Sequence, residues 1–142
     1  MSKYNCIVVD DEPLARKIIE DYISEIDGLE LSASLKSGLE AKQYLDKHAI
    51  DIVFLDINMP KLSGIDLVRN FDLNSLVIFT TAYPEYAVEA FEYSGFDYLV
   101  KPISFERFLK SIDKAKGHLE SKNGETESNG FLIIKENKRL YK

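Results

Sequence analysis

The stretch Ile52–Pro60, with the sequence IVFLDINMP, decides the fold of this chain. It begins with four apolar residues, and a continuous apolar run of this length before a turn signal is typical of a buried strand. Asp56 would then lie at the carboxyl end of the strand, where open α/β sheets bind their ligands. An isolated aspartate at such a position often only caps the following turn. The choice between these interpretations depends on which other residues reach the same edge of the sheet.

Strand and helix patterns alternate along the chain on both sides of this stretch. Strands are predicted at residues 4–9, 29–35, 52–56, 76–79 and 98–100. Amphipathic helices are predicted at residues 13–26, 38–48, 65–71, 86–93 and 105–119, the last with Ser104 as its N-cap. Five alternating strands and helices indicate a parallel sheet with helices on both faces. Because crossover connections are right-handed, we expect an α/β, flavodoxin-like, doubly wound sheet with strand order 2-1-3-4-5.

The composition divides the chain into three parts. Residues 1–120 carry the alternating pattern and are expected to form one domain. Residues 121–130 contain no apolar side chain, which predicts a linker. Residues 131–142 resemble the first two strands of a hairpin, and a two-stranded fragment is not stable alone. We therefore expect residues 131–142 to be the start of a truncated second domain.

The bulk properties are those of an ordinary globular protein, with 45% hydrophobic and 30% charged residues. The single cysteine, Cys6, excludes an internal disulfide and favours a reducing compartment. No apolar run approaches the length of a membrane span, and the first is too short and too soon followed by acids for a secretory signal. A cytoplasmic location without membrane binding is therefore expected. The net charge of −6 is uneven, because residues 101–142 carry 10 Lys and Arg against 6 Asp and Glu.

Polar residues follow the predicted strands at the point where each strand ends. Asp10 and Asp11 follow the first, Asp56 ends the third, and Thr81 and Lys101 follow the fourth and fifth. Since the carboxyl ends of parallel strands share one edge of a sheet, we expect these side chains to converge. Three adjacent carboxylates would repel each other without a cation, and hard oxygen ligands without His or Cys suit Mg²⁺ or Mn²⁺.

Such a site is suited to phosphoryl transfer. A carboxylate such as Asp56 can be the nucleophile and form an aspartyl phosphate. Lys101 and the metal ion would stabilise charge on the transferring group, and Thr81 would offer a hydroxyl donor. Each residue alone has a simpler explanation as a helix cap or a loop residue. Their occurrence at the ends of different strands is what favours a common site.

Residues 3–120 resemble the receiver domain of bacterial two-component response regulators. The matching motifs are VVDDE at residues 8–12, LDINMPKLSG at 55–64, TTA at 80–82 and YLVKP at 98–102. The resemblance implies that Asp56 accepts a phosphoryl group from the phosphohistidine of a sensor histidine kinase. It implies that Asp11, Asp56 and the main-chain carbonyl of Asn58 bind Mg²⁺ directly, while Asp10 acts through water. Lys101 would pair with the phosphoryl group, next to a cis Lys101–Pro102 bond.

The resemblance also implies a switch and a set of partners. Thr81 would close on the phosphoryl group and Tyr98 would turn inward in response. The signal would reach the surface formed by residues 86–119, where a homodimer is expected after phosphorylation. Such a domain is a phosphoacceptor and not a turnover enzyme.

Residues 80–91 and 96–102 are more similar to the LytTR class of response regulators than to the winged-helix class, and residues 131–142 look like the opening strands of a LytTR DNA-binding domain. This class implies DNA binding through the missing domain and transcription regulation. Two other functions fit an Asp nucleophile or an acidic site. A metal-dependent phosphohydrolase is disfavoured, because its D-x-D motif would end the first strand. A pseudo-receiver that takes no phosphate is disfavoured, because no acid and no lysine is lost.

Overall fold

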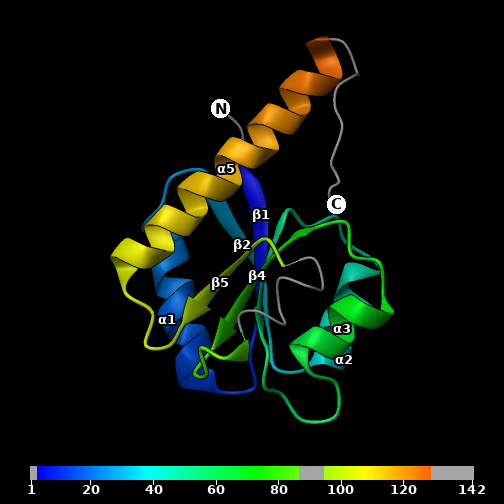
Figure 1. Cartoon of the computed structure of the whole chain (residues 1–142), viewed down its shortest axis with the longest axis vertical. Coiled ribbons are helices and arrows are strands. Elements are labelled where there is room, and N and C mark those ends of the chain that lie inside the picture. The colour runs from blue at the N-terminus through cyan, green and yellow to red at the C-terminus, as the bar shows by residue number, and fades with distance from the viewer. Residues whose placement is uncertain (1–2, 87–94, 129–142) are drawn as a thin grey trace. The chain divides into compact units, whose positions relative to one another are not determined.

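The computed structural model describes residues 3–86 and 95–128, with residues 122–128 described through their backbone only (Figure 1). Its five strands form one parallel sheet in the order β2-β1-β3-β4-β5, which confirms the predicted topology. The strands are β1 Tyr4–Val9, β2 Leu29–Leu35, β3 Ile52–Asp56, β4 Leu76–Thr81 and β5 Asp97–Val100. All of β3 is buried, as expected for the central strand of a sheet that is covered on both faces.

The helices follow the predicted positions with different ends. They are α1 Pro13–Ser24, α2 Gly38–Leu45, α3 Gly64–Asn70 and α5 Phe105–Ser128. The helix predicted at 86–93 falls almost entirely on residues 87–94, outside the described residues. The predicted N-cap of α5 is confirmed, because the Ser104 hydroxyl accepts a 3.1 Å hydrogen bond from the Arg107 N–H.

Three helix ends differ from the prediction by two residues or more. Helices α1 and α2 stop at Ser24 and Leu45, before residues 26 and 48, where the predicted helices end. His48 nevertheless stays beside α2, because its ring stacks on Tyr44 at 3.9 Å. Helix α5 continues to Ser128, so residues 121–128 are helical where a linker was expected. Lys and Glu are good helix formers, and the lack of apolar residues predicted only that this segment has no buried face.

The chain divides into two compact units between Phe108 and Leu109. The first unit, residues 1–108, contains the whole sheet and helices α1, α2 and α3. The second unit, residues 109–142, contains the remainder of α5, in which Ile112 and Ala115 are buried. The expected limits of the receiver domain, the linker and the second domain stay predictions. None of the helices in the described ranges has the length and apolar composition needed to cross a bilayer.

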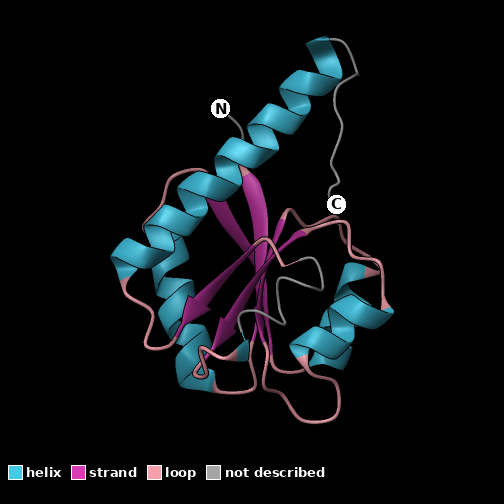
Figure 2. Cartoon of the chain, viewed as in Figure 1, coloured by secondary structure: helices cyan, strands magenta, loops and turns pink. Residues whose placement is uncertain are grey.

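Helices cover both faces of the sheet (Figure 2). Helices α2 and α3 lie on one face, where Ala41 and Leu67 join a core cluster with Leu55 and Phe79. Helix α1 lies on the other face and buries Ile19 and Ile23. The close packing of both faces fixes the strands, and therefore fixes the side chains at their ends.

Side chains bond to the backbone of Tyr98 in β5, which is an edge strand. The Tyr98 N–H donates a 2.8 Å hydrogen bond to Asp97 Oδ1, and Arg107 Nη2 donates a 2.9 Å hydrogen bond to the Tyr98 carbonyl. Arg107 Nη2 also lies 3.0 Å from Asp97 Oδ1, and the Asp97 side chain is nearly buried. Both backbone groups of Tyr98 are thus satisfied on the open side of the sheet.

Candidate acidic site at the carboxyl ends of the strands

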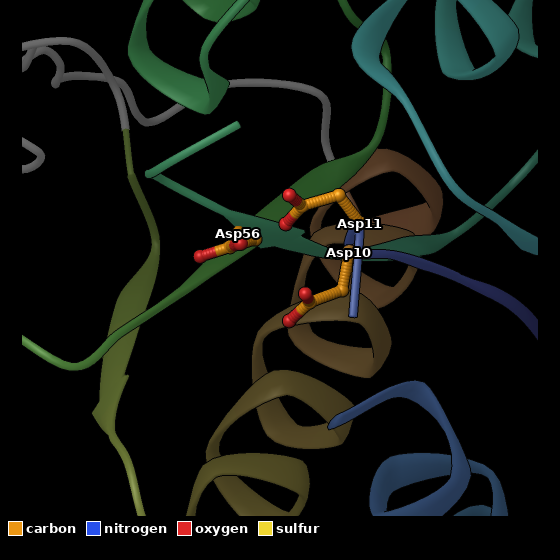
Figure 3. Close-up of side chains that lie close together, drawn as sticks. All are labelled: Asp10, Asp11 and Asp56. Carbon is orange, nitrogen blue, oxygen red and sulfur yellow. The ribbon is translucent and has the colours of Figure 1, made fainter. Parts of the chain in front are cut away.

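Three aspartates meet where β1 and β3 end (Figure 3). Asp10 and Asp11 directly follow β1, and Asp56 is the last residue of β3. One oxygen from each carboxylate lies within 4.8 Å of the others, so the predicted convergence of the three acids is confirmed. Asp10 and Asp56 are buried, whereas Asp11 is exposed. The site is therefore open to solvent through Asp11.

The predicted lysine reaches the same place from β5. Lys101 Nζ donates a 2.9 Å hydrogen bond to Asp10 Oδ2 and lies 3.6 Å from Asp56 Oδ1. It also lies 3.7 Å from Glu12 Oε1, an acid that was not among the predicted site residues. The sequence signal for Glu12 was its position directly after the Asp pair. The Lys101–Pro102 peptide bond is cis, as the family resemblance implied.

The closely spaced acids and the lysine change the pKa values of Asp56 and Lys101. Burial and the neighbouring Asp10 carboxylate raise the pKa of Asp56 from 3.8 to about 7, although Lys101 and the Asn58 N–H act in the opposite direction. Burial alone would lower the pKa of Lys101, but its hydrogen bond to Asp10 and the charges of Asp56, Asp10 and Glu12 raise it. The lysine is therefore charged.

Hydrogen bonds hold every acceptor atom of Asp10. Besides the bond from Lys101, Asp10 Oδ1 accepts a 2.9 Å hydrogen bond from the Glu12 N–H. The Asp10 carbonyl accepts a 2.7 Å hydrogen bond from Arg16 Nη1. Sequence reasoning missed Arg16, because an arginine in the first turns of an amphipathic helix carries no sign that it will reach back to a loop carbonyl.

Asn58 and Thr81 lie beside Asp56. The Asn58 N–H donates a 3.3 Å hydrogen bond to Asp56 Oδ1. The Thr81 hydroxyl is buried and donates to Asn58 Oδ1 at 3.4 Å, while it accepts a 3.0 Å hydrogen bond from the Tyr83 N–H. Asn58 therefore contacts Asp56 directly, and Thr81 contacts Asn58.

Tyr98, the predicted switch residue, lies on β5, one strand away from Thr81 on β4. It pairs with Phe79 in the register of β4 and β5, two residues before Thr81. Its ring is half-buried and packs against the core cluster of the α2 and α3 face.

A close backbone contact fixes the position of Asp56. A Cβ atom added to Gly64 would lie 2.4 Å from the Asp56 carbonyl oxygen, a distance that forces something to move. The Gly64 N–H also donates a 3.1 Å hydrogen bond to the carbonyl of Ile57, and the Ile57 N–H donates one of 3.0 Å to Thr80. Only glycine at the start of α3 lets this helix approach the end of β3 so closely.

The donor set at this site fits a hard divalent cation. The three acids offer only carboxylate oxygens, and the trio contains no His or Cys, which suits Mg²⁺ or Mn²⁺. Both carboxylate oxygens of Asp10 already accept hydrogen bonds, whereas Asp11 faces solvent. The two acids that follow β1 therefore differ in their access to an incoming cation.

Comparisons with known proteins support a common family. The sequence model of the response regulator receiver domain matches residues 6–113. An uncharacterised response regulatory protein from Vibrio cholerae serotype O1 is 42% identical over 120 residues, which are 82% of this chain and 46% of that protein. The transcriptional regulatory protein BtsR from Salmonella typhi is 38% identical over 112 residues, which are 78% of this chain and 47% of that protein. The chain thus spans about half the length of these curated relatives.

A solved structure shows the same fold. The crystal structure of the response regulatory domain of MrkE from Klebsiella pneumoniae matches with a TM-score of 0.76 at 35% sequence identity. The match covers 82% of this chain and 98% of that chain.

Proposed function

Since this chain belongs to the response regulator receiver domain family, we propose that Asp56 is its phosphoacceptor and that a sensor histidine kinase is the phosphoryl donor. The observation that carries this proposal is the position of Asp56, which ends β3 inside the acidic trio with the Lys101 ammonium 3.6 Å away. A carboxylate that only capped a turn would not need to lie beside an ammonium group and two further acids.

The proposed reaction is an in-line displacement at phosphorus. An oxygen of the ionised Asp56 carboxylate forms a bond to phosphorus while the bond from phosphorus to the donor's imidazole nitrogen breaks. The electron pair of the broken bond stays on that nitrogen, and the imidazole leaves as a neutral group because its other ring nitrogen carries a proton. Lys101 is within reach of the new phosphoryl oxygens and would exchange its bond to Asp10 for one to the phosphoryl group. The Asn58 N–H, at 3.3 Å, helps to orient the attacking carboxylate.

Asp11, Asp56 and the Asn58 carbonyl would hold Mg²⁺, with Asp10 acting through water. A bound Mg²⁺ supplies positive charge that offsets the charge of the carboxylates and of the transferring phosphoryl group. Because Asp11 is the exposed member of the trio, it is the acid that a cation arriving from solvent would meet first.

A groove beside the site suits the docking of a protein donor. It has a volume of about 550 Å³ and is lined by side chains from α1 and from the segment after β5. Glu12 and Lys101 of the acidic site form part of its wall, next to Leu14 and Ile18. Leu14 is 74% exposed and Ile18 is 38% exposed, so two large apolar residues of α1 face solvent beside the acidic site. We propose that the kinase domain that carries the phosphohistidine covers this apolar surface.

The output would be regulated through Thr81 and Tyr98. Thr81 would exchange its contacts with Asn58 and Tyr83 for a bond to the phosphoryl group, and the half-buried Tyr98 ring would turn inward. We propose that this change favours a homodimer through the surface of residues 86–119, which includes residues outside the described ranges. LytTR-type DNA binding and transcription regulation, through a domain that follows residue 130, complete the proposal.

The test is phosphorylation of the whole chain by acetyl phosphate with Mg²⁺, followed by intact mass spectrometry. The wild-type chain is expected to gain one phosphoryl group, which hydroxylamine removes because it attacks acyl phosphates. Asp56→Asn should gain none, while the control Asp21→Asn, on the exposed face of α1, should behave like the wild type. Equal labelling of Asp56→Asn and the wild type would overturn the assignment.

A further inference from the structure

Arg16 holds both ends of the short segment that presents Asp11. Its backbone N–H donates a 3.1 Å hydrogen bond to the Glu12 carbonyl. Its side chain reaches in the same direction, and Nη1 donates a 2.7 Å hydrogen bond to the carbonyl of Asp10. Asp11 is the one residue between these two carbonyl groups. One residue of α1 therefore spans the loop that carries the exposed acid of the trio.

The bond to the Asp10 carbonyl controls a rigid group. The Asp10 carbonyl and the Asp11 N–H belong to one planar peptide unit, so a partner that fixes the carbonyl also fixes the direction in which the chain enters Asp11. The other groups of Asp10 are held by different partners. Its N–H donates to the Leu35 carbonyl at 3.0 Å, and its carboxylate accepts from the Glu12 N–H and from Lys101. These bonds do not hold the carbonyl of the Asp10–Asp11 peptide, and the bond from Arg16 does.

We propose that Arg16 is a positioning residue for the acidic site, because it fixes the Asp10–Asp11 peptide so that the Asp11 carboxylate faces Asp56. The proposal rests on the proposed function, in which Asp11 and Asp56 bind Mg²⁺. Arg16 touches neither the metal ion nor the phosphoryl group and acts only through the loop. It belongs to the groups around a metal site that orient the ligands, whose loss typically weakens metal binding.

A positioning role and a purely electrostatic role of Arg16 predict opposite changes in Mg²⁺ affinity when this residue is replaced. The guanidinium is a permanent positive charge whose Nη1 lies 2.7 Å from the Asp10 carbonyl, so its charge opposes the entry of a divalent cation. If charge were its only influence, its removal would strengthen Mg²⁺ binding. If Arg16 positions Asp11, its removal weakens Mg²⁺ binding although one positive charge has been lost. The sign of the change therefore decides between the two effects.

The experiment compares Mg²⁺ binding to the whole chain by isothermal titration calorimetry. We expect Arg16→Met to raise the dissociation constant about tenfold, as for other residues that orient metal ligands. Arg16→Lys keeps the charge but has a single shorter donor group, so an intermediate increase is expected. The matched control is Lys17→Met, which removes the neighbouring charge from an exposed pair with Asp21 and should leave the constant within about twofold.

A second measurement does not depend on the metal ion. In metal-free protein, amide hydrogen exchange followed by NMR should be faster at Asp11 and Glu12 in Arg16→Met than in the wild type, with exchange in β3 unchanged. A dissociation constant for Arg16→Met that is equal to or below the wild-type value would overturn the inference. If Arg16→Met does not fold, Arg16→Lys is judged by the same criterion. A wild-type chain that binds no Mg²⁺ would instead overturn the metal site of the proposed function, and amide exchange would then decide the role of Arg16.

Discussion

Lys101 donates a 2.9 Å hydrogen bond to Asp10, a carboxylate with no exposed surface. The same ammonium group lies 3.6 Å from Asp56 Oδ1, so one cation forms ion pairs with two buried acids. The shorter bond goes to the acid that is not the proposed nucleophile. Lys101 therefore stabilises the site as it stands, and in the proposed reaction a phosphoryl group on Asp56 would have to compete with Asp10 for it.

Replacement of this lysine should destabilise the fold as well as the chemistry. We expect Lys101→Met to lower the free energy of unfolding by about 3 kcal/mol at pH 7, because removal of one partner leaves the buried Asp10 carboxylate without its cation. Urea denaturation measures the loss. Lys17→Met breaks an exposed pair and should cause no measurable change. Equal stability of Lys101→Met and the wild type would show that the bond contributes nothing to the fold.

The stability of the metal-free domain should fall as the pH rises. Burial and Asp10 raise the pKa of Asp56 to about 7 in the folded chain, so the folded state binds the proton more tightly than the unfolded state. The stabilisation from this proton is complete below the ordinary pKa of 3.8 and is lost as the pH rises through about 7. Denaturation in EDTA between pH 5 and pH 8 should show this decline.

Asp56→Asn provides the control for the pH dependence, because asparagine does not ionise. The variant should lack the part of the decline that Asp56 causes and should be more stable than the wild type near pH 8, by about 1–3 kcal/mol. Parallel pH curves for both proteins would contradict the raised pKa. Addition of Mg²⁺ at pH 8 should stabilise the wild type and not the variant, since binding to the folded state alone raises stability.

Two glycines in helices should respond to the same substitution with opposite signs. Gly64→Ala is expected to lower the free energy of unfolding by about 2 kcal/mol, because its Cβ would overlap the Asp56 carbonyl oxygen at 2.4 Å. Gly117→Ala has no atom within 4 Å of the new Cβ and should raise stability by about 0.5–1 kcal/mol through helix propensity. Thermal unfolding of both variants would test this. A neutral Gly64→Ala would show that the end of β3 adjusts without cost.

Thr81→Ala should separate phosphorylation from the switch. The hydroxyl contacts Asn58 and Tyr83, and none of its hydrogen bonds involves the Asp56 carboxylate, so the variant should still be labelled by acetyl phosphate. The response of Tyr98 to beryllofluoride should be lost, because the proposed link through Thr81 is missing. NMR of ring-labelled tyrosine, with Tyr98→Phe to assign the signal, measures this response. A wild-type Tyr98 shift in Thr81→Ala would contradict the proposed switch.

The convergence of the acids and the lysine could be predicted because it depends only on strand direction. Asp10, Asp11, Asp56 and Lys101 each stand at a strand end, and a parallel sheet brings such ends to one edge. The order of the strands followed from the alternation of strands and helices and from the handedness of their connections. These features are periodic or topological, so the sequence carries them directly.

The contacts between side chains and backbone could not be predicted in this way. The bond from Arg16 to the Asp10 carbonyl depends on how far α1 turns before its side chain reaches back, and no residue pattern encodes that distance. The continuation of α5 to Ser128 was missed for a different reason. The absence of apolar residues favours a linker, although charged residues support a helix that needs no buried face.

The side-chain bonds to the Tyr98 backbone affect how the edge strand β5 can pair with another chain. An added strand would have to bond to the N–H and carbonyl of Tyr98, and these already bond to Asp97 and Arg107. A partner strand would first have to break the ion pair and leave Asp97 nearly buried without its cation. Strand addition at Tyr98 is therefore disfavoured, which lowers the tendency of this edge to pair with the edge of another sheet.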